Sequence, residues 1–350
     1  MEHISIPSAL KTGIAPSPQD APAIRWGILG AGWISSTFAN AVTQRTASTI
    51  AAVASRDVTK AQGFIDEHLG SAAQESRAYG SYEELVADDS LDAIYVGTPH
   101  SHHREHALLA IKAGKHVLVE KAFTRNVAEA REVLDAAREA GVFVMEAMWT
   151  RFLPHIAQVR HIIESGVLGD IVTVIADHGQ AFEFDAEHRL YNPDLAGGAL
   201  LDLGVYPVAF AHDVLGLPQE IIARGVLTQT QVDGQISMVF SYGDNSQASL
   251  NTTLWAQTPT TATIAGTKGR IEIDGAFYAP TSFRHITYSR SVASYERDDV
   301  LGLEFEAAEV ARCISDGKTE SPRMPWQATL DIMSMMDDIR AQAGVVYPGE

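Results

Sequence analysis

Residues 26–35 read WGILGAGWIS, an apolar run that leads into two glycines with one alanine between them. Such a run predicts a buried strand that ends in a tight turn. Gly30 would permit the turn, and Gly32 would let the backbone approach a pyrophosphate, whose charge the first amides of the next helix would meet. The third small position of this fingerprint holds Ser35 instead of glycine. The pattern alone is weakly specific, and an ordinary turn from strand to helix is the alternative.

The second apolar run supplies the residues that would contact the adenosine ribose. This run covers residues 49–54, and Ser55 and Arg56 follow it directly. Sites for NAD usually place a carboxylate here. A hydroxyl and a guanidinium suit a 2′-phosphate and an adenine face, so the sequence favours NADP, with NAD as the alternative cofactor. A surface Ser-Arg pair that begins a loop is the structural alternative.

Short apolar runs alternate with amphipathic helical patterns from residue 24 to residue 146, which indicates a parallel sheet with crossover helices. Strands are expected at residues 24–29, 50–54, 93–96, 116–119 and 142–145, and helices at 58–69, 81–87, 103–113 and 127–140. Ligands of such sheets bind beyond the carboxyl ends of the strands. Thr98, Pro99 and His100 follow one expected strand, and Glu120 and Lys121 follow another.

Lys121 follows the carboxyl end of an apolar strand. A lysine at this position can donate to a substrate hydroxyl or favour ionisation of a neighbouring phenol. A salt bridge to Glu120 is the alternative. The histidines of residues 100–106 also suggest a metal site, but a helix beginning near Ser101 would point them several ways, so no metal is expected. We place His100 near the ligand and count His103, which can also pack locally, among the cofactor contacts.

The pattern changes after Glu146, where an aromatic-rich stretch leads into a second domain. Trp149 and Arg151 are candidates for contact with a hydroxylated substrate, and a role at a domain interface is equally open. A helix that opens at Gly198 would put Asp202 and Tyr206 four residues apart on one face, where they could hold two oxygens of one substrate. A packed helix whose Asp202 pairs locally is the alternative.

The rest of this domain is expected to form a mostly antiparallel sheet with two closing helices. Its first strand is expected at 171–180 as an edge strand. The other strands are expected at 221–229, 235–242, 246–254, 261–265, 270–274 and 285–289, and helices at 303–314 and 327–343. Gly243-Asp244-Asn245 is expected to turn a hairpin. The predicted layout is a flexible arm at residues 1–23, a dinucleotide-binding domain at 24–147 and a substrate-binding and oligomerisation domain at 148–350.

The net charge and the cysteine count indicate which partners and which cell compartment to expect. The formal net charge of the 350 residues is −18, which disfavours nucleic acid and anionic membranes as partners. Cys313 is the only cysteine, so a reducing, cytoplasmic location is expected. No apolar run approaches the ~20 residues of a membrane span, and no secretory leader is expected.

The order of these motifs resembles the glucose-fructose oxidoreductase, inositol dehydrogenase and rhizopine-catabolism (Gfo/Idh/MocA) family. The resemblance rests on the glycine turn, Ser55-Arg56, GTPHSHH at 97–103, AGKHVLVEK at 113–121 and GGALLDLGVYP at 197–207. EAMWTRF at 146–152 and the tyrosine at 206 look most like the branch of dimeric dihydrodiol dehydrogenase and NADP-dependent D-xylose 1-dehydrogenase. One residue departs from the family pattern, because Ala122 stands where proline usually follows the lysine.

The resemblance implies an α/β Rossmann domain followed by an α+β domain with a large open sheet, whose free face forms a homodimer or homotetramer interface. It implies hydride transfer between NADP and a secondary alcohol or hemiacetal carbon of a sugar, polyol or dihydrodiol. In that branch the catalytic pair maps onto Lys121 and Tyr206, with Asp202 orienting a hydroxyl or relaying the proton. A cofactor-recycling lyase, isomerase or sugar–sugar oxidoreductase, or a regulator without turnover, remains an alternative.

The predicted site residues fall into three groups. The catalytic group is Lys121, Tyr206 and Asp202. The cofactor group is Gly30, Gly32, Trp33, Ile34, Ser55, Arg56, Thr98, Pro99, His100, His103, Glu120 and Lys121. The substrate group is Trp149, Arg151, Phe182 and Tyr206.

Overall fold

The computed structural model describes residues 14–243 and 245–350. Its backbone contacts divide the chain into two compact units. The parallel-sheet unit comprises residues 16–149 and 301–333, and the described part of the mixed-sheet unit comprises residues 14–15, 150–300 and 334–350. Residues 1–13 of the predicted arm (residues 1–23) lie outside the described residues. The domain limits at 24–147 and 148–350 remain predictions, and the contacts group residues 301–333 with the first unit.

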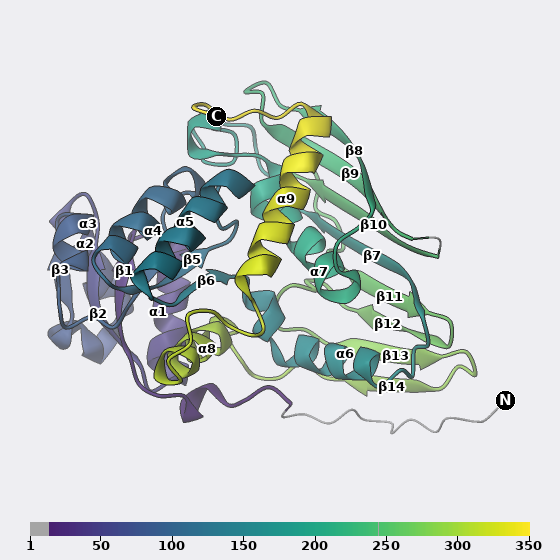
Figure 1. The fold of residues 1–350 in the computed structure, drawn as a ribbon, viewed down its shortest axis with the longest axis horizontal. Helices are drawn as coiled ribbons and strands as arrows, with labels where there is room; N and C mark the ends of the chain where they lie inside the picture. The colour runs from purple at the N-terminus through teal and green to yellow at the C-terminus, as the bar shows by residue number, and fades with distance from the viewer. Residues whose placement is uncertain (1–13, 244) are drawn as a thin grey trace. The chain divides into compact units, whose positions relative to one another are not determined.

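The first unit contains the predicted doubly wound parallel sheet, with strand order β3-β2-β1-β4-β5-β6 (Figure 1). Every neighbouring pair in this sheet is parallel. The strands are β1 (Arg25–Leu29), β2 (Thr49–Ala54), β3 (Arg77–Tyr79), β4 (Ala93–Val96), β5 (His116–Glu120) and β6 (Val144–Ala147). The helices that begin in this unit are α1 (Trp33–Arg45), α2 (Val58–His68), α3 (Tyr82–Val86), α4 (His103–Lys112), α5 (Val127–Ala140), α8 (Leu303–Ser315) and α9 (Trp326–Ala343). Strand order reverses at β1 and β4, and ligands of such sheets bind at this point.

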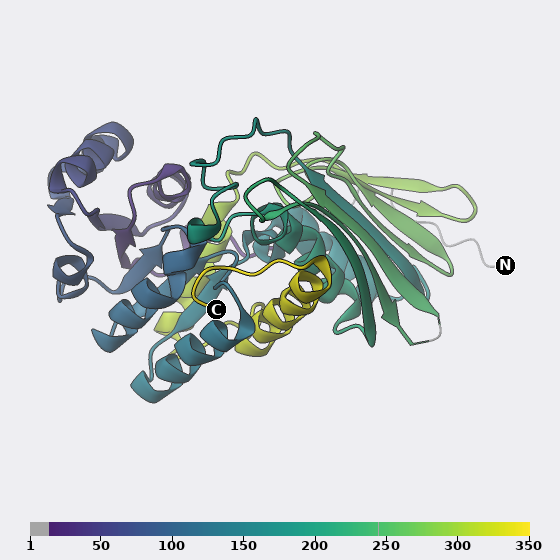
Figure 2. The same cartoon turned by 90° about the horizontal axis from the view of Figure 1, so that it is seen from above.

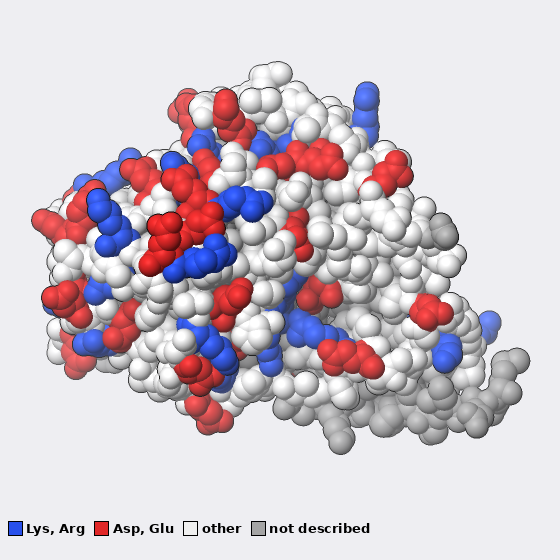
Figure 3. All heavy atoms as spheres, viewed as in Figure 1, with Lys and Arg blue, Asp and Glu red and all other residues white. Residues whose placement is uncertain are grey.

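The surface of this unit carries charges of both signs. Figure 3 shows acidic and basic side chains side by side over α4 and α5. Several are ion pairs, such as that of Arg104 with Glu132 and that of Arg138 with Asp135. Pairing of this kind spreads the net negative charge without a large field of one sign on this face.

The second unit contains the predicted large, mostly antiparallel sheet, with order β14-β13-β12-β11-β7-β10-β9-β8. Its strands are β7 (Ile171–Gly179), β8 (Glu220–Leu227), β9 (Asp233–Tyr242), β10 (Ser246–Thr253), β11 (Ala262–Gly266), β12 (Gly269–Ile273), β13 (Phe283–Thr287) and β14 (Val292–Tyr295). β7 pairs in parallel with β10, and the other neighbours are antiparallel. The prediction that β7 is an edge strand is wrong, since it lies between β11 and β10.

Helices cover one face of this sheet (Figure 2). They are α6 (Pro154–Glu164), the π-helical turn Leu200–Gly204 with α7 (Val205–Leu215), and the end of α9. Among the described residues, the stretch Pro193–Leu215 is the one helical segment long and apolar enough to cross a membrane, and 89% of its apolar window is buried inside the protein. It is therefore a core helix, and the hydrophobic effect holds it on the sheet.

Candidate active site

The turn after β1 leaves room for phosphates at the start of α1. Gly30 has a φ of +100°, and a Cβ there would lie 2.9 Å from Thr98 Cγ2, so glycine is required. Gly32 is the N-cap of α1, and among the residues that the structure describes no side chain caps the helix at this point. A Cβ on Gly32 would meet no described atom within 4 Å. The start of α1 thus has open space beside Gly32 and no side-chain cap, which fits the pyrophosphate of a dinucleotide.

The next residues of α1 show why serine replaces the third glycine of the fingerprint. Ser35 is fully buried, and its Oγ lies 2.3 Å from where a Cβ on Gly97 would be. The helix therefore packs closely on the end of β4 because Gly97 has no side chain. Trp33 is 78% exposed and Ile34 is half-buried on the same first turn, where we predicted cofactor contacts.

The residues predicted to contact the adenosine ribose follow β2. Ser55 is buried, whereas Arg56 is exposed. Burial, the neighbouring histidines and the guanidinium of Arg56 lower the pKa of His106 to about 4, which places Arg56 near that ring. The next carboxylate, Asp57, accepts a hydrogen bond of 2.8 Å from the backbone N–H of Thr59 and caps α2. The loop after β2 therefore begins with the hydroxyl of Ser55 and the guanidinium of Arg56. The next carboxylate, that of Asp57, is engaged in capping α2.

Buried histidines connect the ends of β4 and β5. The ring of His103 lies 2.7 Å from the carbonyl oxygen of Thr98 and 2.9 Å from that of Ala122. Burial lowers the pKa of His103 to about 4, so at pH 7 the neutral ring carries one N–H and donates to only one of these two carbonyl oxygens. His100 Nε2 donates to the carbonyl oxygen of Lys121 at 3.2 Å. These rings hold the two strand ends together, and the structure does bring these predicted cofactor residues to one edge of the sheet.

Lys121 directly follows β5 at that edge and is half-buried. Its backbone N–H donates to the carboxylate of Glu120 at 3.1 Å, and the hydroxyl of Tyr95 donates to the other oxygen of that carboxylate. The peptide bond between Lys121 and Ala122 is cis. Pro99, whose φ of −61° and ψ of 151° describe extended backbone, precedes His100 on the neighbouring strand end. Lys121 is thus fixed through its backbone at the carboxyl end of the sheet.

In the mixed-sheet unit, Asp202 lies within a π-helical turn and Tyr206 lies in the first turn of α7. The guanidinium of Arg189 donates to both oxygens of Asp202, at 3.0 and 3.1 Å. Burial works against the charge of Arg189, but Asp202 and the phenol of Tyr206 raise its pKa above the usual value. Asp202 and Tyr206 therefore lie near the same cation, and the two residues predicted to act together are close in space.

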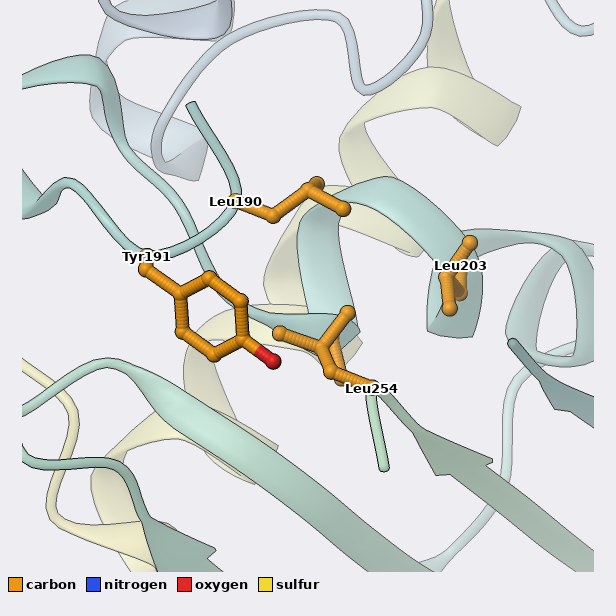
Figure 4. Packing of buried hydrophobic residues seen from close by; sticks show 5 residues of the cluster. Leu190, Tyr191, Leu203 and Leu254 are labelled. Carbon is orange, nitrogen blue, oxygen red and sulfur yellow. The ribbon is translucent and has the colours of Figure 1, made fainter. Parts of the chain in front are cut away.

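A small apolar cluster fixes the turn that carries Asp202 (Figure 4). The cluster consists of Leu190, Tyr191, Ala199, Leu203 and Leu254, and the predicted substrate residue Phe182 packs against it. The hydroxyl of Tyr191 donates to the carbonyl oxygen of Phe182 at 2.9 Å. The loop before the turn is thereby held in the core, which sets the position from which Arg189 reaches Asp202.

A buried carboxylate from β9 caps the same turn. Asp233 is fully buried, and one of its oxygens accepts a hydrogen bond of 2.6 Å from the backbone N–H of Leu200. A Cβ on Gly198 would lie 2.2 Å from the other oxygen, so glycine makes room for the carboxylate. The hydroxyl of Tyr347 donates to the carbonyl oxygen of Gly197 at 2.7 Å. Two residues from distant parts of the sequence thus fix the start of the segment that leads to Tyr206.

The two aromatic-stretch candidates fall in different units. Trp149 is the last residue of the parallel-sheet segment and is half-buried. Arg151 is buried in the mixed-sheet unit, where its guanidinium donates to the ring of His212 at 2.9 Å and lies 3.8 Å from the carboxylate of Asp213. These contacts tie Arg151 to the end of α7. Its role as a substrate contact remains a prediction.

Sequence reasoning missed the aromatic and amide neighbours of Tyr206. Tyr278 stacks on the ring of Tyr206 with 4.2 Å between centroids, and His178 lies against both rings. Gln180 bonds both Tyr278 and His178. His178 and Gln180 end or follow β7, while Tyr278 lies in a loop more than 70 positions after Tyr206. No local spacing links these residues, so contact information was needed to find them.

Two family models match the chain. One, described as an oxidoreductase family with an NAD-binding Rossmann fold (GFO/IDH/MocA), matches residues 24–148, and the GFO/IDH/MocA C-terminal domain matches residues 156–272. The chain is similar to a D-xylose 1-dehydrogenase (NADP(+)) of Hypocrea jecorina, with 36% identity over 93% of each chain. It is equally similar, at 36%, to a trans-1,2-dihydrobenzene-1,2-diol dehydrogenase of Xenopus tropicalis, over 93% of this chain and 100% of that one.

Solved structures show the same fold. A 3-ketoreductase of Actinomadura kijaniata in complex with NADP and TDP-benzene aligns with a TM-score of 0.81 and 25% identity, over 92% of this chain and 98% of that chain. An aldose-aldose oxidoreductase of Caulobacter crescentus aligns with a TM-score of 0.80 and 23% identity over the same shares. Both cover the parallel-sheet and mixed-sheet parts of the chain.

Proposed function

This chain belongs to the GFO/IDH/MocA oxidoreductase family and is an NAD(P)-dependent dehydrogenase acting on a CH–OH group, and on that premise we propose its cofactor, substrate class and catalytic residues. The cofactor is NADP. The enzyme transfers hydride between the nicotinamide and a secondary alcohol or hemiacetal carbon of a sugar, polyol or dihydrodiol. Relatives named for xylose and for a dihydrodiol support this class of substrate.

The residues present fit a dinucleotide. The pyrophosphate would lie in the open space beside Gly32, where the first amides of α1 would bind it. Thr98, Pro99 and His100, which follow β4, would lie beside the nicotinamide ring. The bound nicotinamide supplies the hydride acceptor of the oxidation or the hydride donor of the reduction. Ser55 and the exposed Arg56 would hold a 2′-phosphate, since a guanidinium binds phosphate with charge-assisted hydrogen bonds.

Tyr206 exchanges the proton of the reacting hydroxyl in this mechanism. It takes the proton during oxidation and returns it during reduction. Lys121 supplies a positive charge that favours the ionised phenol and hydrogen-bonds the substrate oxygen. Asp202, held by Arg189 from both of its oxygens, orients an adjacent hydroxyl. The observation that carries the proposal is that Asp202, held by Arg189 from both of its oxygens, lies four residues before Tyr206 in a chain of this oxidoreductase family.

The test of the catalytic pair is turnover followed by reduced-nicotinamide absorbance, with NADP⁺ and a panel of pentoses, hexoses, inositols and aromatic dihydrodiols. Lys121→Met and Tyr206→Phe should each lower kcat at least about 100-fold, because each removes a group that acts in proton transfer. Cofactor affinity, measured by fluorescence titration, should change little. Lys318→Met and Tyr288→Phe are matched controls, since Lys318 and Tyr288 are exposed and lie in peripheral turns.

Wild-type turnover in either Lys121→Met or Tyr206→Phe would overturn the assignment of that residue. If no substrate in the panel gives net reduction while the purified protein retains cofactor tightly, the recycling mechanism is favoured over a dehydrogenase. In that case single-turnover absorbance would show transient reduction of the bound cofactor, which a regulator would not show.

The cofactor preference is tested with Arg56→Ala. The loss of charge-assisted hydrogen bonds should raise KM for NADP⁺ by about 10- to 100-fold. KM for NAD⁺, which has no 2′-phosphate, should change less than about threefold. Arg312→Ala is a control in the same unit, because Arg312 is bonded to the backbone of Ser17. Equal losses for both cofactors would contradict the assignment of Arg56 to the phosphate.

We propose a cytoplasmic location as well. The support is the single cysteine, which is buried. Cell fractionation with an antibody against the full chain would test it.

A further inference from the structure

Tyr206 is one member of a cluster of three rings that come from three different elements. Tyr278, in the loop between β12 and β13, stacks on Tyr206 with centroids 4.2 Å apart and planes 20° apart. His178, at the end of β7, lies 4.4 Å from the ring of Tyr278 and 5.5 Å from that of Tyr206. All three belong to the mixed-sheet unit. Tyr278 therefore covers one flat side of the phenol to which we assign proton transfer.

The loop that carries Tyr278 is held firmly against α7. Phe277 is fully buried and packs edge-on against Phe210, with centroids 5.2 Å apart. Phe210 follows Tyr206 by four residues, so the two rings project from the same side of α7. Two adjacent loop residues thus pack on two successive turns of this helix, and the ring of Tyr278 is placed by a buried anchor next to it.

Hydrogen bonds hold the backbone of the same loop. The hydroxyl of Thr150 donates to the carbonyl oxygen of Tyr278 at 2.8 Å. His155 Nε2 donates to the carbonyl oxygen of Phe277 at 3.1 Å, and burial lowers the pKa of His155 to about 4, so this donor is neutral at pH 7. The backbone N–H of Phe277 donates to the carbonyl oxygen of Thr260 at 2.9 Å. The loop is thus attached to three other segments of its unit.

Polar contacts set the orientation of the other two rings. His178 Nδ1 lies 3.1 Å from the carbonyl oxygen of Leu203, so Nδ1 carries the proton and donates it. His178 Nε2 is then an acceptor, and the amide of Gln180 donates to it at 3.0 Å. The same side chain of Gln180 bonds the hydroxyl of Tyr278. The ring of His178 therefore cannot turn without breaking one of its two bonds, and the bond from Gln180 holds the hydroxyl end of Tyr278 in place.

We propose that Tyr278 is a positioning residue whose ring fixes the plane and the reach of the Tyr206 phenol. The inference rests on the proposed function, in which Tyr206 exchanges the substrate proton. Rotation about the Cα–Cβ bond moves the hydroxyl oxygen of a tyrosine, and the broad torsion about the bond to the ring sets the plane in which its O–H bond lies, so packing on the ring face helps to hold both. Proton transfer is sensitive to the position of the donor and acceptor atoms at the level of an ångström. A flat ring stacked on Tyr206 removes that freedom without a bond to the reacting oxygen.

The test compares Tyr278→Leu, which removes the ring, with Tyr278→Phe, which keeps it. Tyr278→Leu should lower kcat by about 10- to 100-fold, because a misplaced phenol loses the aligned geometry. KM for NADP⁺ should stay within about twofold, since the ring lies in the unit that carries Tyr206. Tyr278→Phe should recover most of the lost kcat. Tyr288→Phe is the matched control, since Tyr288 lies ten positions later and is 71% exposed.

A double variant separates positioning from a general structural effect. If Tyr278 acts through Tyr206, Tyr206→Phe with Tyr278→Leu should be no slower than Tyr206→Phe alone. A further loss of the same size in that background would overturn the inference, and so would wild-type kcat in Tyr278→Leu. Wild-type turnover in Tyr206→Phe would instead overturn the proposed function. Should Tyr278→Leu be unfolded by circular dichroism, Tyr278→Met, which lacks a flat ring, has the same expected results.

Discussion

Arg189 defines the electrostatics around the proposed proton-transfer group in its own unit. Its side chain is 52% exposed, while that of Asp202 is 10% exposed. The two parallel hydrogen bonds between them orient the carboxylate as a single point charge would not. The phenol of Tyr206 contributes, after Asp202, to raising the pKa of Arg189. Arg189 is therefore suited both to fix Asp202 and to stabilise negative charge on the phenol.

Arg189→Gln should lower kcat/KM by about 10- to 100-fold, because charge-assisted hydrogen bonds are replaced by at most one neutral bond. Steady-state kinetics with the substrate found in the panel measures this. In an Asp202→Asn background the same substitution should have a much smaller effect, since its partner has already lost its charge. Fully additive losses would show that Arg189 does not work through Asp202.

At the residue scale, the sequence showed which residue types carry chemistry but not which of them pair. Lys121 and Asp202 stood out because of their places after a strand and in a glycine-rich helix. The partner of Asp202 lies 13 positions earlier, in a loop without a repeating pattern, and only the packing of Tyr191 into the core brings it there. The stacking partner of Tyr206 is farther still. Such pairs depend on the tertiary fold, which overrides local spacing.

The segment before Tyr206 depends on a buried acid that belongs to another element. Burial raises the pKa of Asp233 to about 7, against the pull of the Leu200 backbone N–H and the charge of Arg340. Tyr347 also faces this carboxylate, and the charge of Asp233 contributes to raising the pKa of its phenol. The protonation of one carboxyl thus affects how firmly the π-helical turn is capped.

The stability of the chain should depend on this carboxyl near neutral pH. Its folded pKa of about 7 exceeds the ordinary 3.8, so the folded state holds the proton more tightly than the unfolded chain. The resulting stabilisation is complete below pH 4 and is lost as the pH rises through 7. The difference in unfolding free energy between wild type and Asp233→Asn should therefore shift against the wild type between about pH 4 and 7 and level off above that range.

Urea unfolding of both proteins at several pH values measures that difference. Other buried acids, such as Glu306, titrate in both proteins and cancel in the comparison. Parallel curves of unfolding free energy against pH would contradict the assignment. Tyr347→Phe is the control variant, since it removes the hydrogen bond to Gly197 but keeps the titrating carboxyl of Asp233.

At the element scale, the sequence predicted elements best where burial follows a clear period. The bounds of β4 and α5 agree with the prediction residue for residue, because each is a complete apolar run or amphipathic pattern with a cap. β3 was missed because none of its three residues is buried, and β14 because its burial alternates over only four residues, whereas all four residues of β4 are buried. β7 was mistaken for an edge because alternation reports only that one face is exposed, and a strand with one exposed face can still pair on both sides.

The outer face of the mixed sheet is the feature of the whole molecule that most clearly calls for a partner. Cross-strand pairing places Ile222, Val239, Ser249 and Ile175 in one row over β8, β9, β10 and β7. The apolar members of this row are 39–56% exposed. A shallow groove of about 380 Å³ runs over them and over Arg224 and Asp177. Apolar patches of this kind on open sheets mark protein interfaces.

A second copy of this chain is the partner that we propose for the row. In a two-fold interface the same residues meet themselves, so apolar side chains of one row would pack on the same row of the other copy. The charged residues Arg284 and Glu272 continue the row over β13 and β12 and form an ion pair. They would lie at the rim, where interfaces are polar. Each substitution in the row would appear twice in the assembly.

Ile222→Glu should therefore separate the copies, because two carboxylates would be buried without partners at the centre of the interface. Sedimentation velocity should give twice the chain mass for wild type and the single-chain mass for the variant. Val58→Glu is the matched control, since Val58 is 49% exposed on α2 of the other unit and should leave the mass unchanged. A wild-type mass of four chains that falls to two would make this face one of two interfaces in a tetramer. A monomeric wild type, or an Ile222→Glu protein with unchanged mass, would exclude this face as the interface.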